Sequence, residues 1–336
     1  MPQRDDRIRL TPALLGMPAQ HSTRVVASGL LDELLAAQDR FAAEDAEGLH
    51  DLRVAMRRLR SWMRAFRPEL SDTVRGRTRR RLHALASATN EARDTEVVLD
   101  FLDRQTNLPA RSRATARALA ERLGNARDAH VRALRRTLAR DLTKVTRGLA
   151  MQLESWWERH AVDEPRPVPS TSAVLADAIH RHLRRVDRAL ARIEPPGKAD
   201  DLHRARIAVK RLRYLLEPLD ESLGAAEPIR QLQALQGELG DARDAHRIAM
   251  QLVREVGEHS ARSARRRALT SVGVAGDDDA APPETAVTRA GLTELARRAH
   301  AARETALSEF TTRWREAEIA ALVEQVRAVA ARLVAG

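Results

Sequence analysis

Residues 49–60 read LHDLRVAMRRLR, and residues 202–213 repeat this pattern as LHRARIAVKRLR. Both segments have the apolar spacing of an amphipathic helix, with an apolar residue every three or four positions. At about 100° per residue, the basic residues of each segment fall on one stripe that borders the apolar face of its helix. The first stripe contains His50, Arg53, Arg57, Arg60 and Arg64, and the second contains His203, Arg206, Lys210 and Arg213.

A row of like charges on a helix costs free energy. Cations three or four residues apart repel each other by roughly 0.2–0.5 kcal/mol per pair. A helix that needs only solubility alternates acidic and basic residues instead. For one such helix, a solvated charged face remains the simplest alternative. Because the stripe recurs at matched angular positions in two helices, the sequence favours an anion bound along both.

The apolar faces of the two helices predict where each is buried. They are formed by Leu49, Leu52, Met56, Leu59, Met63 and Phe66 in the first copy, and by Leu202, Val209, Leu212, Leu216 and Leu219 in the second. We expect the basic stripes to lie at the edges of the protein core.

The rest of the chain predicts an all-α protein, because its long segments have helical spacing and none shows sustained alternation. Helices are expected in the first half over about 24–43, 49–66, 71–102 and 110–160. Two similar four-helix units follow from this pattern. We expect a mobile N-terminal tail over 1–22, a first unit over 23–162, a Pro-rich linker over 163–171, and a second unit over 172–336 with an exposed loop at 271–284.

The composition narrows the class of partner. The 336 residues carry 58 Lys and Arg against 47 Asp and Glu, a formal net charge of +11. This balance favours a polyanion such as nucleic acid, an acidic membrane surface or a phosphate polymer. Aromatic residues make up only 3%, which weakens the case for single-stranded nucleic acid, since its recognition relies on stacking.

Several classes of site and location are excluded or disfavoured. The absence of cysteine excludes disulfides, thiolate metal sites and cysteine nucleophiles. No apolar run approaches the about 20 residues of a membrane span, and Pro12 interrupts the only candidate for a secretory segment. We therefore expect a cytoplasmic protein that does not span a membrane. His180 and His182 lack the i,i+4 spacing of metal ligands and are expected at the surface.

Each half also carries a second basic element after its stripe. Residues 91–94 read EARD in the first half, and residues 241–244 read DARD in the second. A third segment, LGNARDAH at 123–130, is very similar to LGDARDAH at 239–246. It lies too late in its half to be the matching element, and we interpret it as a helical look-alike.

The doubled pattern His-x-x-Arg-(Val/Ile)-x-x-(Arg/Lys)-Arg-Leu-Arg, followed by a Leu-Gly-x-x-Arg-Asp element, resembles the CHAD family (conserved histidine α-helical domain). The resemblance spans about residues 24–333. It implies two four-helix bundles related by pseudo-twofold symmetry around a central basic groove or pore. It also implies binding of inorganic polyphosphate and association with polyphosphate granules. Two departures are Thr89-Asn90 in place of Leu-Gly, and Glu217 at the angular position of Arg64.

The resemblance also implies the residues that bind polyphosphate, and Arg64 joins them by its place in the stripe. They are His50, Arg53, Arg57, Arg58, Arg60, Arg64, Arg93, His203, Arg206, Lys210, Arg211, Arg213 and Arg243. Asp94 and Asp244 are expected to orient arginines rather than to contact the ligand. Solvation remains an alternative role for Arg58 and Arg211, and a backbone hydrogen bond at a helix start remains one for the two histidines. We predict no cofactor, metal site or catalytic residue.

Arginine suits a polyphosphate ligand, because its forked donors match phosphate oxygens. From His50 to Arg64 a helix rises about 21 Å, so one stripe reaches several consecutive phosphates. Bound phosphate favours cationic imidazole, and we therefore expect binding to strengthen toward pH 6.

Two other functions are weaker alternatives. Enzymes that transfer or hydrolyse phosphate commonly need carboxylates that hold Mg²⁺ or Mn²⁺. The stripes offer no such cluster, so we expect the protein not to be an enzyme. Nucleic-acid binding is the second alternative, because a basic helix can lie along a phosphate backbone. Competition between duplex DNA and polyphosphate separates the two binding functions.

Overall fold

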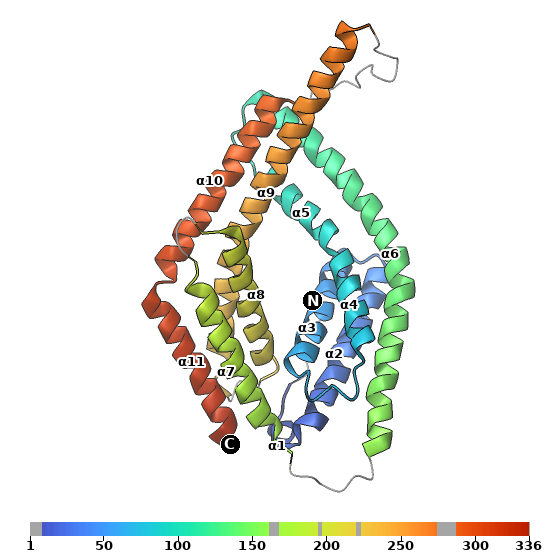
Figure 1. Ribbon diagram of the computed structural model, residues 1–336, viewed down its shortest axis with the longest axis vertical. Helices are drawn as coiled ribbons and strands as arrows, with labels where there is room; N and C mark the ends of the chain where they lie inside the picture. Colours follow the sequence, from blue (N-terminus) through green and yellow to red (C-terminus); the bar gives the residue numbers. More distant parts are fainter. Residues whose placement is uncertain (1–8, 161–167, 194–196, 220–222, 274–286, 336) are drawn as a thin grey trace. The chain divides into compact units, whose positions relative to one another are not determined.

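The computed structural model describes residues 9–160, 168–193, 197–219, 223–273 and 287–335 (Figure 1). Within these ranges every regular element is a helix, which confirms the all-α prediction. The helices are α1 (Pro12–Gly16), α2 (Ala19–Ala42), α3 (Gly48–Ala65), α4 (Gly76–Ala88), α5 (Asn90–Asp103), α6 (Ala110–His160), α7 (Thr171–Leu190), α8 (Ala199–Leu216), α9 (Ala226–Ser271), α10 (Arg289–Arg313) and α11 (Glu316–Ala335). None of these described helices is both long and apolar enough to cross a membrane.

The helix expected over 71–102 is two helices in the structure, α4 and α5, which meet at Thr89. The Thr89 hydroxyl donates a hydrogen bond to the Ala86 carbonyl at 2.8 Å. A local bond of this kind competes with the hydrogen bonds that would continue the helix. The break therefore has a side-chain cause at the position where the sequence departs from the Leu-Gly pattern.

The described part of the expected N-terminal tail is packed against the protein. Leu10 is fully buried, and its N–H donates to the Pro218 carbonyl at 2.7 Å. Thr11 caps α1 by accepting a hydrogen bond from the Leu14 N–H. The remaining parts of three predictions, namely residues 1–8 of the tail, 163–167 of the linker and 274–284 of the loop, lie outside the described residues.

The chain forms two compact units. Unit 1 takes its residues from the ranges 1–90, 132–237 and 313–336, and unit 2 takes its residues from 91–131 and 238–312. Each unit therefore contains residues from both halves of the sequence. The two long helices α6 and α9 each contribute one part to unit 1 and the other part to unit 2. The pseudo-symmetry of two sequential bundles stays a prediction.

In unit 1, α2 packs on α3, α7 packs on α8, α11 covers α7, and α3 contacts α8. The two apolar faces predicted from the sequence are buried, which confirms this prediction. The residues that are inaccessible to solvent include Leu52, Met56, Leu59, Leu202, Val209, Leu212 and Leu216. Full burial of such a side chain contributes about 1.5–3 kcal/mol. This burial fixes the rotation of α3 and α8, and with it the direction in which their basic stripes point.

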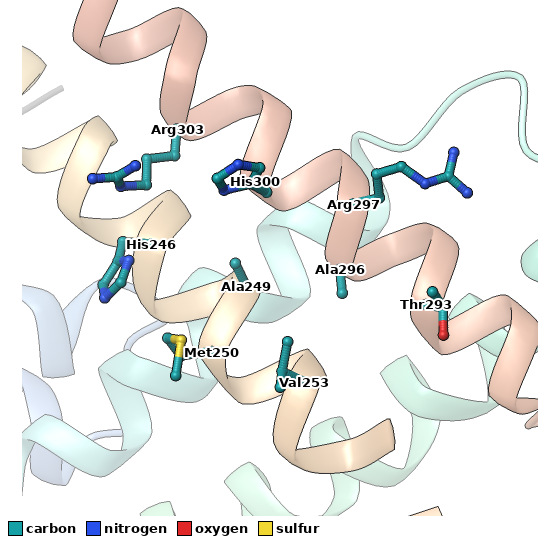
Figure 2. A pocket seen from close by; sticks show the side chains of 9 residues that line it. All are labelled: His246, Ala249, Met250, Val253, Thr293, Ala296, Arg297, His300 and Arg303. Carbon is teal, nitrogen blue, oxygen red and sulfur yellow. The ribbon is translucent and has the colours of Figure 1, made fainter. Parts of the chain in front are cut away.

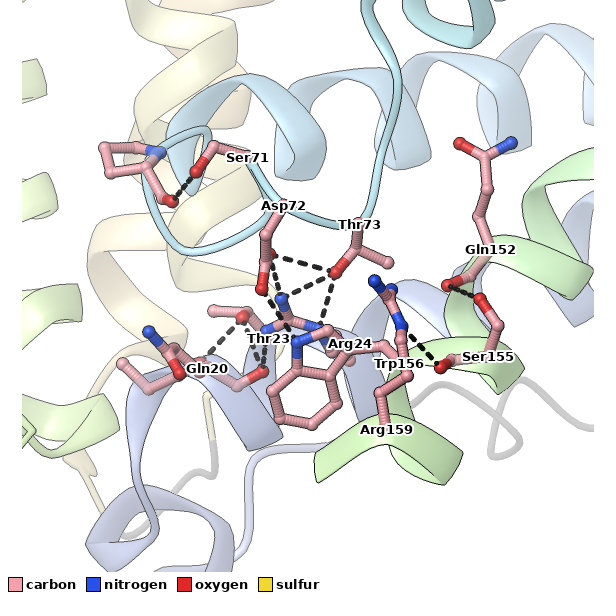
Figure 3. Close-up of polar contacts among 12 residues, drawn as sticks. Gln20, Thr23, Arg24, Ser71, Asp72, Thr73, Gln152, Ser155, Trp156 and Arg159 are labelled. Carbon is pink, nitrogen blue, oxygen red and sulfur yellow. Dashed lines mark hydrogen bonds and ion pairs between the residues drawn. The ribbon is translucent and has the colours of Figure 1, made fainter. Parts of the chain in front are cut away.

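A buried arginine ties three segments of unit 1 together (Figure 3). Arg24 of α2 is inaccessible to solvent and donates hydrogen bonds to Asp72 at 2.6 Å and to Thr73 at 3.0 Å. Its guanidinium carbon lies 3.7 Å from the ring centroid of Trp156 on α6, whose indole N–H donates to Asp72 at 2.9 Å. Burial lowers the pKa of Arg24 to about 10, and Asp72 partly offsets this effect.

Unit 2 has its own hydrophobic core, built from α5, α10 and parts of α6 and α9. The core contains Val98, Leu102, Leu119, Leu252, Leu292 and Leu295. Around it, Arg122 pairs with Glu255 at 2.6 Å, and Arg298 donates to the carbonyls of Thr106 and Asn107. Apolar packing and ion pairs thus hold the four segments together.

The Arg24 network predicts a pH-dependent loss of stability in Asp72→Asn. The change leaves a buried guanidinium without its carboxylate, at a cost of about 1–3 kcal/mol at pH 7. Burial, the largest effect, raises the pKa of Asp72, but hydrogen bonds from Trp156, Thr73 and the backbone, together with the charge of Arg24, hold this pKa below its ordinary value. The carboxylate therefore stabilises the fold above pH 4 and ceases to do so as pH falls through its lowered pKa.

Urea unfolding of both proteins at pH 7 and pH 3 measures this effect. The difference in unfolding free energy should shrink at the lower pH. Asp177→Asn, at an exposed position of α7, is the control and should change neither value. Equal stability of wild type and Asp72→Asn at pH 7 would show that the network is dispensable.

Candidate functional site

The two repeated helices, α3 and α8, pack against each other within unit 1 (Figure 1). Two contacts join their side chains. The Arg57 guanidinium carbon lies 5.9 Å from the ring centroid of Tyr214, and Arg58 Nε lies 3.3 Å from a carboxylate oxygen of Glu217. Because Arg213 of the second stripe lies 4.8 Å from the same Tyr214 ring centroid, the two stripes approach each other at Tyr214.

Cations from both stripes gather at this contact. The charges of Arg57, Arg60, Arg206 and Arg211 act on Lys210, and those of Arg60, Arg64 and Arg185 act on Arg211. Arg185 comes from α7, and the others come from α3 and α8. We call this set the cationic cluster; its members are Arg57, Arg60, Arg64, Arg185, Arg206, Lys210 and Arg211.

Lys210 responds most strongly to the cationic cluster. Burial, and after it the charges of Arg57, Arg206, Arg211 and Arg60, lower its pKa from 10.5 to about 7. Burial and the charges of Arg64, Arg185 and Arg60 lower the pKa of Arg211 to about 10. Both shifts have the sign expected when positive charges crowd together away from water. An anion bound among them would reverse both shifts.

Two predicted site residues are held by carboxylates instead. Glu217 accepts a hydrogen bond from Arg213 at 2.7 Å, and it lies 3.3 Å from Arg58. Glu33 of α2 also lies 3.3 Å from Arg58. The acidic residue that shortens the second stripe therefore neutralises part of it. Arg58 and Arg213 are tied into ion pairs beside the cationic cluster.

The remaining stripe residues of unit 1 lie at the first turns of the same helices. His50 is exposed, whereas Arg53 and His203 are half-buried. These three residues extend both stripes from the cationic cluster toward the starts of α3 and α8, and their part in ligand binding stays a prediction. Within the cationic cluster itself, Arg60 contacts His83 of α4, with 2.6 Å between an Nη atom and Nδ1.

The second basic elements lie in unit 2. Arg93 is 3.6 Å from Glu96, and Arg243 is 3.6 Å from Asp244. Asp94 pairs with Arg247 at 2.6 Å. The look-alike segment is in the same unit, where Arg127 donates to Asp128 at 2.6 Å. Because these groups and the cationic cluster belong to different units, entry of Arg93 and Arg243 into a shared groove stays a prediction.

Helix α7 contributes to the site in a way that the sequence did not predict. His182, expected at the surface, is buried, and its Nδ1 donates to the Ala178 carbonyl at 2.9 Å. Burial lowers its pKa, and Arg185 and Arg211 add to that effect. Helical spacing from the apolar Leu175, Ile179 and Val186 places His182 on the core face. This apolar spacing in the sequence could have predicted that His182 is buried.

A pocket of about 590 Å³ with several basic side chains lies between α9 and α10 in unit 2 (Figure 2). His246, His300, Arg297 and Arg303 line it together with apolar side chains such as Met250. Burial, Arg303 and His300 lower the pKa of His246. Figure 2 shows that the Arg297 side chain extends away from the two histidines. In the described residues of both units, no group of three or more His, Asp or Glu side chains is arranged to hold a metal ion.

Comparison with known proteins gives one family. The model of the CHAD domain family matches residues 26–254. The crystal structure of the CHAD domain from the plant Ricinus communis has a TM-score of 0.64 at 19% identity, over 97% of this chain and 96% of that one. PptA from Streptomyces chartreusis has a TM-score of 0.61 at 16% identity, over 89% and 100%. No curated protein matches. At these identities the structural likeness shows the fold.

Because burial and neighbouring positive charges disfavour the charged form of Lys210, we predict that Lys210→Met stabilises the protein. Between pH 7 and 10.5 the unfolded chain keeps a proton at this residue that the folded chain loses. Wild-type stability therefore rises with pH across that range, and the full cost of the charge is present below pH 7. One pKa unit corresponds to about 1.4 kcal/mol. We expect the variant to gain on the order of 3 kcal/mol at pH 6 and less at pH 9.

Urea unfolding at low ionic strength measures this difference. Lys198→Met, at an exposed position, should leave stability unchanged at every pH. A Lys210→Met protein no more stable than wild type at pH 6 would mean that the positive charges are already compensated.

Proposed function

The chain belongs to the CHAD domain family, and we propose that it binds inorganic polyphosphate along the cationic cluster between α3 and α8. One feature carries the proposal: α3 and α8 are in contact, and the charges of arginines from both repeats act on Lys210 of the second repeat. Cations that repel each other in the free protein become favourable when a polyanion lies between them. The two copies of the basic motif would then act on one ligand.

The chemistry of the cationic cluster suits a phosphate polymer. Six of its seven members are arginines, whose planar forks pair with phosphate oxygens in a bidentate manner. Each stripe continues along its helix, so a linear ligand meets further cations beyond the cluster. Tyr214, the aromatic residue that contacts Arg57, is buried, and the chain has few aromatic residues. A ligand without bases fits better than single-stranded nucleic acid.

We propose binding without catalysis. The charged neighbours that shift the pKa of Lys210 are all arginines, whereas metal-assisted phosphate chemistry needs carboxylates near the phosphate. Glu217 is engaged with Arg58 and Arg213. A protein that holds long polyphosphate chains would also collect on polyphosphate granules, and we propose that location within the cytoplasm.

Binding should be coupled to proton uptake. Phosphate next to Lys210 raises its pKa from about 7 toward the ordinary value, so the complex holds a proton that the free protein has partly lost. Affinity therefore increases as pH falls toward 7.

Calorimetric titration with polyphosphates of graded length tests the proposal. Affinity should rise with chain length, because a longer chain reaches more of both stripes. Combined replacement of Arg53, Arg57, Arg206 and Lys210 by Ala should weaken binding by at least about 100-fold, since each lost charge-assisted hydrogen bond is worth about 1.5–3 kcal/mol. Helicity should be retained.

A matched variant separates the site from overall charge. Arg117, Arg136, Arg254 and Arg262 are exposed and lie outside the cationic cluster. Their combined replacement by Ala removes the same formal charge and should weaken binding less than fivefold. Equal losses of polyphosphate affinity in the two quadruple variants would indicate diffuse electrostatic attraction rather than a specific site.

Competition with duplex DNA tests the main alternative. A duplex holds its phosphates on a wide, rigid surface, whereas polyphosphate is a thin chain that can pass between two helices. We expect charge-equivalent duplex DNA to leave most of a labelled polyphosphate bound, as followed by fluorescence anisotropy at fixed salt. Ready displacement by DNA would favour a nucleic-acid-binding protein.

A further inference from the structure

Glu217 places a carboxylate where the first repeat has a cation. The equivalent residue of the first repeat is Arg64. Glu217 is the C-cap residue of α8, and the partial negative charge of a helix C-terminus disfavours a carboxylate there. The side chain is only 12% exposed, so it is not an ordinary solvated charge. An unfavourable charge at this position requires specific partners.

Each oxygen of the Glu217 carboxylate faces its own arginine. One oxygen accepts a hydrogen bond from Arg213 at 2.7 Å, and the other lies 3.3 Å from Arg58 Nε. Arg213 is itself only 14% exposed and also donates from Nε to Gln236 at 3.2 Å. Hydrogen bonds between charged groups are about twice as strong as neutral ones. The carboxylate therefore holds two arginines of the repeated motifs in the protein without ligand.

Arg213 borders the cationic cluster. Its guanidinium carbon lies 4.8 Å from the ring centroid of Tyr214, and that of Arg57, a member of the cluster, lies 5.9 Å from the same centroid. Because the two guanidinium groups contact one ring, a chain of linked phosphates at Arg57 can extend as far as Arg213. Glu217 and such a chain would then compete for the same guanidinium.

The space on the other side of Glu217 is too small for a phosphate group. A cavity of about 20 Å³ is lined by residues that include Glu33, Arg58, Tyr214 and Glu217. This volume holds about one water molecule. Arg58 also has a second carboxylate, Glu33, at 3.3 Å. A ligand can therefore gain Arg213 only by drawing it away from Glu217, whereas Arg58 stays with its carboxylates.

We propose that Glu217 is a specificity-determining residue that ends the phosphate track on α8, by competing with the ligand for Arg213. The inference rests on the proposed binding of polyphosphate and adds a negative element to that site. Transfer of Arg213 to a phosphate leaves the largely buried Glu217 without its strongest partner and beside a second anion. Both effects oppose the gain from the new contact.

The two repeats would then hold different lengths of ligand. The stripe of α3 continues to the exposed Arg64, whereas the stripe of α8 would offer the ligand no cation beyond Lys210. A repulsive charge at the end of a binding surface fixes the register of a ligand more than it changes the affinity. Glu217 would in this way limit the number of phosphates that one protein molecule binds.

Glu217→Gln tests the inference in the full chain. Glutamine keeps the shape and one oxygen that can accept the hydrogen bond from Arg213, but it removes the charge. Affinity for long-chain polyphosphate should rise at least about fivefold in calorimetric titration, because Arg213 becomes available to the ligand. The dependence of affinity on salt should steepen by about one charge. Glu154→Gln, at an exposed position of α6 in unit 1, changes the net charge equally and should alter affinity less than about twofold.

A double-mutant cycle with Arg213→Gln identifies the cation that Glu217 withholds. Loss of Arg213 should weaken polyphosphate binding at least about threefold more in the Glu217→Gln protein than in wild type. Urea unfolding of each protein shows whether it is folded under the conditions of the titration. A large loss of affinity in Arg213→Gln alone, equal to that in the double variant relative to Glu217→Gln, would show that the ligand already holds Arg213 and would overturn the inference.

The outcomes also separate this inference from the proposed function. Tight polyphosphate binding by wild type, with the same affinity and salt dependence in Glu217→Gln, would overturn the role of Glu217 and leave the proposed function intact. Absence of binding to polyphosphate of any length, in wild type and Glu217→Gln alike, would overturn the proposed function and this inference with it.

Discussion

Contact between α3 and α8 brings the positive charges of two repeated helices together inside unit 1. The contact is stable because burial of each large apolar side chain stabilises the fold by about 1.5–3 kcal/mol. Each pair of like charges on a helix destabilises it by only roughly 0.2–0.5 kcal/mol. The fold therefore keeps the cations close in the absence of a ligand. The lowered pKa of Lys210 is the clearest consequence of that constraint.

The apolar pattern of the sequence predicted most of the helices and both buried faces. Leu52, Leu59 and Leu212 are buried where helical spacing places them. The same spacing predicted the edges on which the basic stripes lie, because a helix that buries one face orients the other. It did not predict the break at Thr89, which depends on a side-chain hydrogen bond to the Ala86 carbonyl.

The composition of the cationic cluster was less predictable, because it depends on contacts between segments far apart in sequence. Arg185 joins the cluster through the packing of α7 on α8. Glu217 forms ion pairs with both Arg58 and Arg213. The pair with Arg58 forms only because α3 packs beside the end of α8. The sequence of one helix predicts which basic residues could bind an anion. Contacts with other helices determine which of these residues have no acidic partner.

Polyphosphate binding as proposed depends on one property of the protein, a shared excess of positive charge at Lys210 that a phosphate polymer relieves. The chain has three lysines, so NMR of protein with ¹³C-labelled lysine side chains can follow each one through a pH titration. We expect one lysine to titrate near pH 7 in the free protein and at least one pH unit higher when long-chain polyphosphate is bound. Three lysines that all titrate near 10.5, with or without polyphosphate, would contradict the account.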